Sequence, residues 1–153
     1  DKETAHAVLL SLAETVGMRL RLANLCGRVI GISVRKSCDL ITYSHQAKIQ
    51  SSIDCTDAIY EYGKGLFDAV WKGEPIRSLG IWVSDLSSAG YIQLSALERD
   101  WDKKKKVDEA VDAIRTKYGP LSIVRANFLQ SGLAPLTGGA GGDSGFPVMT
   151  SIL

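Results

Sequence analysis

The chain has 153 residues, 45% of them hydrophobic and 23% charged, and its 18 Lys and Arg nearly balance its 17 Asp and Glu. This length suits one domain with a hydrophobic core, with or without an arm, and is too short for a multidomain enzyme. The composition excludes wholesale disorder, and no apolar run approaches the roughly 20 residues that cross a bilayer. Three cysteines are too widely spaced for a disulfide framework or a metal-binding pair: Cys26, Cys38 and Cys55. We therefore expect a cytoplasmic protein that has no metal site and no membrane partner.

The positive charge is concentrated in one segment. The segment between residues 19 and 48 contains six cationic residues and one acidic residue, Asp39, so its net charge is +5, while that of the whole chain is +1. The six cations are Arg19, Arg21, Arg28, Arg35, Lys36 and Lys48. A nearly neutral chain with one basic segment indicates either a localised anionic partner or a solvated cationic face.

Hydrophobic periodicity predicts an α+β fold. Apolar residues recur at three- and four-residue steps in some segments and alternate with polar residues in others. The expected elements are helix 3–24, strands 28–36 and 41–50, helix 56–72, strand 76–84 and a charged helix at about 102–118. The two adjacent strands form a β-hairpin, and the element order is close to a two-layer sandwich of the split β-α-β type. We therefore expect helices on one face of a small, mostly antiparallel sheet.

Particular side chains are expected to fix the helices in place. Asp1 or Thr4 can cap the first helix, and Asp54 or Thr56 can cap the second. His45 lies on the core side of its strand, where a partly buried side chain is expected. The acids of the chain are assigned to solvated helix faces and termini. The charged helix has a narrow apolar stripe made of Val107, Val111, Ile114 and Tyr118.

The open face of the predicted sheet indicates a partner. Its side chains are small or cationic and almost none is acidic: Gly31, Ser33, Arg35, Thr42, Ser44, Gln46, Lys48, Ser78, Gly80 and Ser84, with Trp82 as the one aromatic. Small residues let a phosphate backbone approach the strands, while Arg and Lys neutralise its charge. Readers of single strands place several aromatics on the sheet, so this face favours duplex DNA. An ordinary solvated sheet face remains the alternative.

An ordered set of motifs over roughly residues 1–129 resembles a known family. The motifs are Arg19-Leu20-Arg21, Gly27-Arg28-Val29, Thr56-Asp57-Ala58-Ile59-Tyr60, Trp71-Lys72-Gly73-Glu74-Pro75-Ile76-Arg77 and Leu79-Gly80-Ile81-Trp82-Val83-Ser84-Asp85-Leu86. In this order they resemble the C-terminal little finger domain of bacterial Y-family translesion DNA polymerases, of the UmuC-like and MucB-like branches. The resemblance implies a domain that holds primer–template duplex DNA through phosphates, without reading its sequence.

The resemblance also implies particular residue roles. DNA contact is carried over to Arg28, Arg35, Lys36, Ser44, Gln46, Lys48 and Ser78. A peptide that docks on the sliding clamp in this family corresponds to Gln93, Leu94 and Leu97, although Ala96 and Leu97 stand where the family has Leu and Phe. The catalytic carboxylates of the family, which hold two Mg²⁺ ions, belong to a palm domain without a counterpart here. This chain alone is therefore expected to be inactive and to need no cofactor.

The expected organisation has three parts. They are a DNA-binding domain over residues 1–86, a clamp-peptide loop with a helical extension over 87–130, and a Gly-rich tail over 131–153. The family has a strand before its first helix, and the apolar run 146–153 either fills that position or forms a disordered tail. Two functions stay open at this point: a DNA-binding domain of a translesion polymerase, and an interaction module that docks on the clamp or a repair partner.

Overall fold

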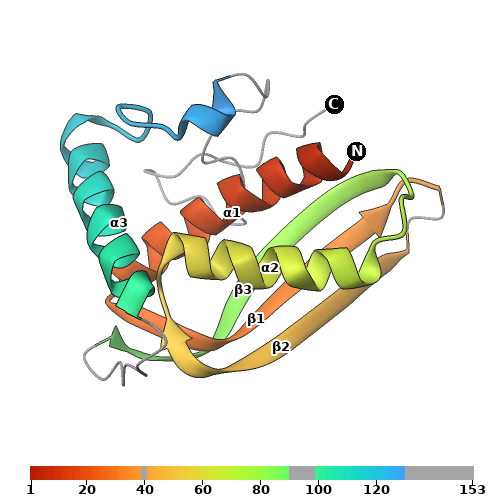
Figure 1. Cartoon of the computed structure of the whole chain (residues 1–153), viewed down its shortest axis with the longest axis horizontal. Helices are drawn as coiled ribbons and strands as arrows, with labels where there is room; N and C mark the ends of the chain where they lie inside the picture. The colour runs from red at the N-terminus through yellow and green to blue at the C-terminus, as the bar shows by residue number, and fades with distance from the viewer. Residues whose placement is uncertain (39–40, 90–98, 130–153) are drawn as a thin grey trace.

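A three-stranded antiparallel sheet carries two helices on one face (Figure 1). The computed structural model describes residues 1–38, 41–89 and 99–129. Its elements are α1 (Lys2–Leu22), β1 (Leu25–Lys36), β2 (Thr42–Ile53), α2 (Thr56–Val70), β3 (Ile76–Ser88), α3 (Arg99–Tyr118) and the short 3-10 helix η3 (Ala126–Phe128). The predicted α+β class and element order are confirmed. None of the helices in these ranges is long and apolar enough to span a membrane.

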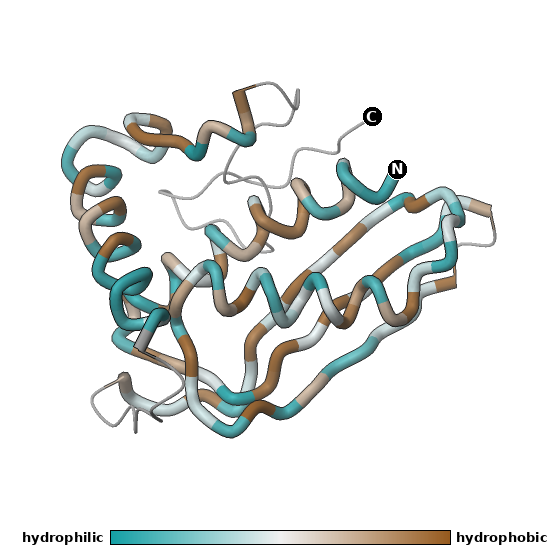
Figure 2. The backbone as a smooth tube through the Cα atoms, viewed as in Figure 1, coloured by the Kyte–Doolittle hydropathy of each residue, from teal (hydrophilic) through white to brown (hydrophobic). Residues whose placement is uncertain are grey.

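The sheet has the strand order β2-β1-β3, with β1 in the centre. Every pairing is antiparallel, and the hairpin register places Arg35 opposite Thr42 and Ile32 opposite His45. On the other side of β1, Ile32 lies opposite Ile81. Because side chains alternate along a strand, this register puts the core residues Ile30 and Ile32 of β1, Ile49 of β2 and Ile81 of β3 on one face. Hydrophobic residues recur among hydrophilic ones along the strands (Figure 2).

Two clusters of buried side chains fill the space between this face and the helices. Ile30 and Ile59 are fully buried in one cluster, and Ile32 and Phe67 are fully buried in the other. Burial of one such side chain stabilises a fold by about 1.5–3 kcal/mol. The apolar layer thus holds α1 and α2 on one face of the sheet and leaves the opposite face open.

The helix ends agree only in part with the expected caps. The carboxylate of Asp1 accepts a hydrogen bond of 2.7 Å from the backbone N–H of Thr4, as predicted for α1. The prediction of Asp54 or Thr56 as the cap of α2 is wrong, because Cys55 is the N-cap and makes no side-chain cap bond. The backbone N–H of Thr56 instead donates to Oδ2 of Asp108 on α3, at 2.7 Å. A carboxylate at this place also complements the positive end of the α2 dipole.

Helix α3 packs through its charged face, which the sequence assigned to solvent. Most of its buried or half-buried side chains recur at three- and four-residue steps: Trp101, Lys105, Asp108, Asp112 and Arg115. The predicted apolar stripe lies largely outside, with Val107 62% and Tyr118 67% exposed. The assignment of the acids to solvated surfaces is therefore wrong for several of them. Besides the packing of Trp101 against the core, ion pairs with α1 and with Asp54, just before α2, hold α3 in place.

One further expectation fails at the edge of the sheet. His45 lies on the helix-side face but is exposed, as is its neighbour Tyr43, which is 43% exposed. β2 is an edge strand, and the helices leave this end of its inner face open to solvent. The correct face assignment therefore did not entail burial.

Candidate nucleic-acid interface

The open face of the sheet consists of four rows of side chains that cross all three strands. Each row has one residue of β1 in its centre, with its partner on β2 before it and its partner on β3 after it. The rows are Lys48-Val29-Ser84, Gln46-Gly31-Trp82, Ser44-Ser33-Gly80 and Thr42-Arg35-Ser78. The structure thus brings five of the predicted contact residues together on one face: Arg35, Ser44, Gln46, Lys48 and Ser78.

Trp82 lies flat across the centre of this face. A Cβ atom built on Gly31 would come within 2.2 Å of the indole ring, so the ring rests directly on the β1 backbone. A glycine is needed there because any side chain would displace the ring. One aromatic held against the sheet does not form the row of stacking platforms typical of single-strand binders.

Cationic side chains stand at both ends of the face. Arg28 and Lys48 lie at one end, where Arg28 Nη2 and Lys48 Nζ approach the same oxygen, Oδ2 of Asp85, at 3.3 and 3.4 Å. Arg35 lies at the other end, between Thr42 and Ser78, and is exposed. Uncharged residues separate the two ends, namely Gln46, Gly31 and Trp82 in one row and Ser44, Ser33 and Gly80 in the next, so the charge is at the margins of the face.

Lys36 is held away from the open face. Its Nζ forms a 2.6 Å ion pair with Glu74 and lies 4.7 Å from the centre of the Tyr43 ring, which belongs to the helix-side face of the sheet. The hydrogen bond from Lys36, together with backbone N–H groups, lowers the pKa of Glu74 from 4.5 to about 2. The structure therefore ties Lys36 to the connection between α2 and β3, and its role in DNA contact stays a prediction.

The residues of the clamp peptide, Gln93, Leu94 and Leu97, lie outside the described residues. Clamp docking therefore stays a prediction from the sequence. The terminal run 146–153 also lies outside them.

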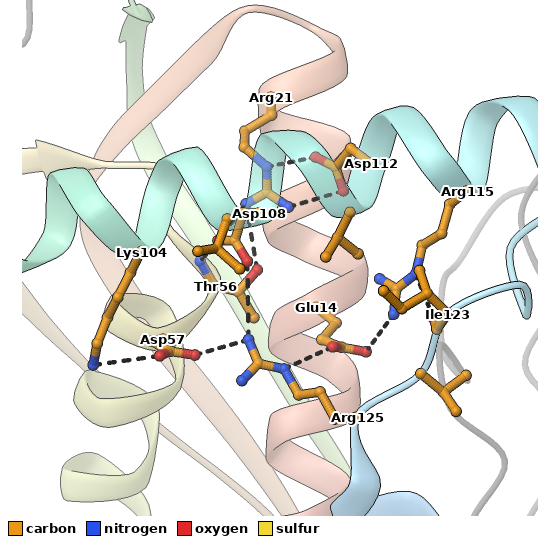
Figure 3. Close-up of a pocket in the computed structure, with 13 residues that line it drawn as sticks. Glu14, Arg21, Thr56, Asp57, Lys104, Asp108, Asp112, Arg115, Ile123 and Arg125 are labelled. Carbon is orange, nitrogen blue, oxygen red and sulfur yellow. Dashed lines mark hydrogen bonds and ion pairs between the residues drawn. The ribbon is translucent and has the colours of Figure 1, made fainter.

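A second feature, which the sequence analysis missed, is a cavity of about 250 Å³ beside α3 (Figure 3). Charged side chains from four segments line it, and they pair with one another. Arg125 lies 2.8 Å from both Glu14 and Asp57, while Arg115 lies 3.4 Å from Glu14. Within the described ranges, every buried polar side-chain atom has a hydrogen-bond partner, and no cluster of acidic, His or Cys residues could hold a metal ion. The ion pairs that line this cavity therefore join the segments around it, and we refer to them as the joint.

Arg21 is the centre of that joint. Its guanidinium donates to Asp112 at 2.6 and 3.2 Å, to Asp108 at 3.1 Å and to the backbone oxygen of Asp54 at 2.7 Å. Burial alone would lower the pKa of Arg21, but the hydrogen bond to Asp112 and the nearby carboxylates outweigh it and raise that pKa. The spacing of residues 101, 105, 108, 112 and 115 on one helical face was the signal that could have located this joint.

The fold and the open, cation-bearing sheet face define a small α+β domain suited to lie against an anionic surface. A family model described as "impB/mucB/samB family C-terminal domain" matches residues 1–96. The chain therefore belongs to the family of impB/mucB/samB C-terminal domains, which confirms the resemblance to the C-terminal domain of Y-family DNA polymerases.

Similar proteins carry names from DNA synthesis and repair. "DNA polymerase IV" of Clostridium acetobutylicum is 37% identical over 131 residues, which cover 85% of this chain and 33% of that protein. "DNA polymerase IV 2" of Bacillus subtilis is 36% identical over 128 residues, covering 82% and 31%. "Putative UV-damage repair protein UvrX" of Bacillus subtilis is 34% identical over 144 residues, covering 90% and 35%. The chain thus spans about a third of the length of these relatives.

Proposed function

We propose that this chain is the non-catalytic DNA-binding domain of a translesion DNA polymerase and that its open sheet face holds duplex DNA. One observation carries the proposal: small residues and cations occupy most of the face that the helices leave uncovered. A phosphate backbone can approach glycine and serine closely, while Arg35 and Lys48 lie at the two ends of the face, where they can neutralise phosphates. Contacts of this kind are independent of base sequence, as copying past damaged bases requires.

The family membership supports this assignment of the face. The relatives are named as polymerases and as a UV-damage repair protein, and the matched third of each corresponds to nearly all of this chain. In the proposed parent protein, nucleotidyl transfer and its Mg²⁺ ions belong to residues outside this chain. The role of this domain is to hold the duplex in position near that centre, which is a contribution of binding and orientation.

Titration of the chain with a fluorescent primer–template duplex, followed by anisotropy at several salt concentrations, tests the proposal. Arg35→Ala and Lys48→Ala should each weaken binding equally for unrelated sequences, and each should flatten the salt slope by roughly 0.9 per lost phosphate contact. Lys103→Ala is the matched control, since Lys103 is exposed on α3 and not on the sheet. Absence of salt-sensitive binding by the unmodified chain, or equal effects of all three variants, contradicts the assignment.

A further inference from the structure

One acid belongs to the cationic end of the open face, and its backbone is unusual. Asp85 has a φ of +55°, in the left-handed region that residues other than glycine rarely adopt. Its neighbours Ser84 and Leu86 keep regular antiparallel partners on β1. The pairing of β3 with β1 continues on both sides of Asp85 but skips Asp85 itself and Arg28 opposite it, where the pairing of β1 with β2 also shifts between Gly27 and Val29. Backbone outliers such as Asp85 gather at functional sites, which makes this position a place to look for function.

The conformation of Asp85 changes what its carboxylate can reach. Simple alternation places Ser84 on the open face and would place Asp85 on the helix side. Oδ2 of Asp85 nevertheless lies 3.4 Å from Nζ of Lys48, a residue of the open face two strands away. The same oxygen lies 3.3 Å from Nη2 of Arg28 on the central strand. The carboxylate thus gathers cations of β1 and β2 at one point.

That point has the chemistry of a phosphate-binding site. A carboxylate oxygen and a phosphodiester oxygen are both anionic acceptors, and Arg and Lys bind either. All three side chains are accessible, with exposures of 45% for Arg28, 66% for Lys48 and 39% for Asp85. A phosphate of a bound duplex can therefore reach the two cations, and it then competes with the acid that already holds them.

We propose that Arg28 and Lys48 form one phosphate-binding site whose strength Asp85 limits by acting as an internal counter-ion. This inference rests on the proposed function, because the competing anion is a phosphodiester of bound DNA. The acid reduces the net charge of the three residues to +1, and it keeps both cations engaged when no DNA is present. Asp85 thus sets the affinity of this site for a DNA phosphate.

Asp85→Asn tests this inference with little change in structure. Asn is nearly the same size as Asp and is among the residues that best tolerate positive φ, so the strand should keep its conformation. The variant should bind the primer–template duplex about two- to fivefold more tightly at low salt, the range expected for a screened, exposed ion pair. Its salt slope should be steeper by up to roughly 0.9 for one additional phosphate contact. Both differences should shrink at high salt, because the added attraction is screened.

Two comparisons separate this mechanism from a general effect of charge. Glu109→Gln removes one negative charge from an exposed position of α3, and it should leave affinity and slope nearly unchanged. In a Lys48→Ala background, Asp85→Asn should have a clearly smaller effect, because only Arg28 remains to be released.

The outcomes distinguish the two proposals. If neither the unmodified chain nor Asp85→Asn binds duplex DNA at low salt, the proposed function fails. If the chain binds but Asp85→Asn matches Glu109→Gln, or acts equally well without Lys48, DNA binding stands and the counter-ion role of Asp85 is refuted. Weaker binding by Asp85→Asn also refutes it, since Asp85 would then organise the cations for DNA.

Discussion

The removal of Arg21 should destabilise the domain more than any surface change, because Arg21 joins three helices. It comes from the last turn of α1 and bonds two carboxylates of α3 and the segment that opens α2. The side chains of Arg21, Asp108 and Asp112 are only 7%, 9% and 10% exposed. Arg21→Met keeps much of the volume but leaves buried carboxylates with less compensating charge.

The magnitude follows from the burial of these groups. Loss of one partner from a buried ion pair costs about 3–5 kcal/mol, because the remaining charge stays desolvated. Because a domain of this size has a total stability of about 5–15 kcal/mol, this loss removes a large part of the free energy of unfolding. Arg21→Lys should recover part of the loss, since one ammonium group replaces one contact but cannot reproduce the forked contact with Asp112.

Urea unfolding of the variants measures this loss as a fall in midpoint at constant slope. The informative comparison is the double variant Arg21→Met/Asp112→Leu, which removes Arg21 together with the carboxylate that it contacts twice, while Asp108 keeps the hydrogen bond from the N–H of Thr56. Apolar replacement of a whole buried pair is often nearly neutral, so the double variant should be more stable than Arg21→Met alone. A loss under about 1 kcal/mol for Arg21→Met, or additive losses in the double variant, would refute the reasoning that these charges are desolvated and coupled.

Two further predictions concern single side chains. The pKa of Glu74 is lowered to about 2, so its pair with Lys36 stabilises the folded state above about pH 4.5 and loses that contribution as the pH falls toward 2. The difference in Tm between the unmodified chain and Glu74→Gln should therefore shrink over this interval; a constant difference contradicts it. Gly31→Ala should cost about 1–3 kcal/mol in urea unfolding because it displaces Trp82, whereas Gly65→Ala, in an open helical position, should not destabilise.

The sheet and its face assignment could be predicted from the sequence because a strand that buries one face has a strict period. The alternation around Ile32 and Ser33 fixes which residues face the helices, and a shift by one residue would bury Arg35. The same argument gave the order of the helices and the cationic open face. These features depend on hydrophobic pattern alone, and pattern is local in the sequence.

The features that could not be predicted depend on pairs of distant residues. Arg21 and Asp112 are 91 positions apart, and nothing adjacent to either residue in the sequence shows that the two form a pair. Asp85 reads as an ordinary polar residue between Ser84 and Leu86, since hydrophobic pattern carries no information on a single positive φ. Periodicity therefore located the open face of the sheet. It missed Asp85, the counter-ion proposed for that face, and the ion pairs of Arg21 that join the helices.

Helix α3 offers the sharpest test of this distinction, because two adjacent residues lead to opposite expectations. By hydrophobic pattern, Val107 belongs to the packed stripe and Asp108 to the solvent. In the structure Val107 is 62% exposed and Asp108 is 7% exposed, with Oδ2 of Asp108 bonded to Arg21 and to the N–H of Thr56. The charged face thus packs where an apolar face was expected.

Val107→Gln should therefore change the free energy of unfolding by no more than about 0.5 kcal/mol, as exposed helix substitutions usually do, and Gln is at least as good a helix former as Val. Asp108→Asn should cost about 2–3 kcal/mol, because an amide oxygen still accepts the bond from Thr56 but no longer compensates the charge of Arg21. Urea unfolding of the two variants, side by side, ranks the residues directly. The reverse ranking would mean that α3 docks through its apolar stripe, and the ion-pair joint would then contribute little to holding the helices together.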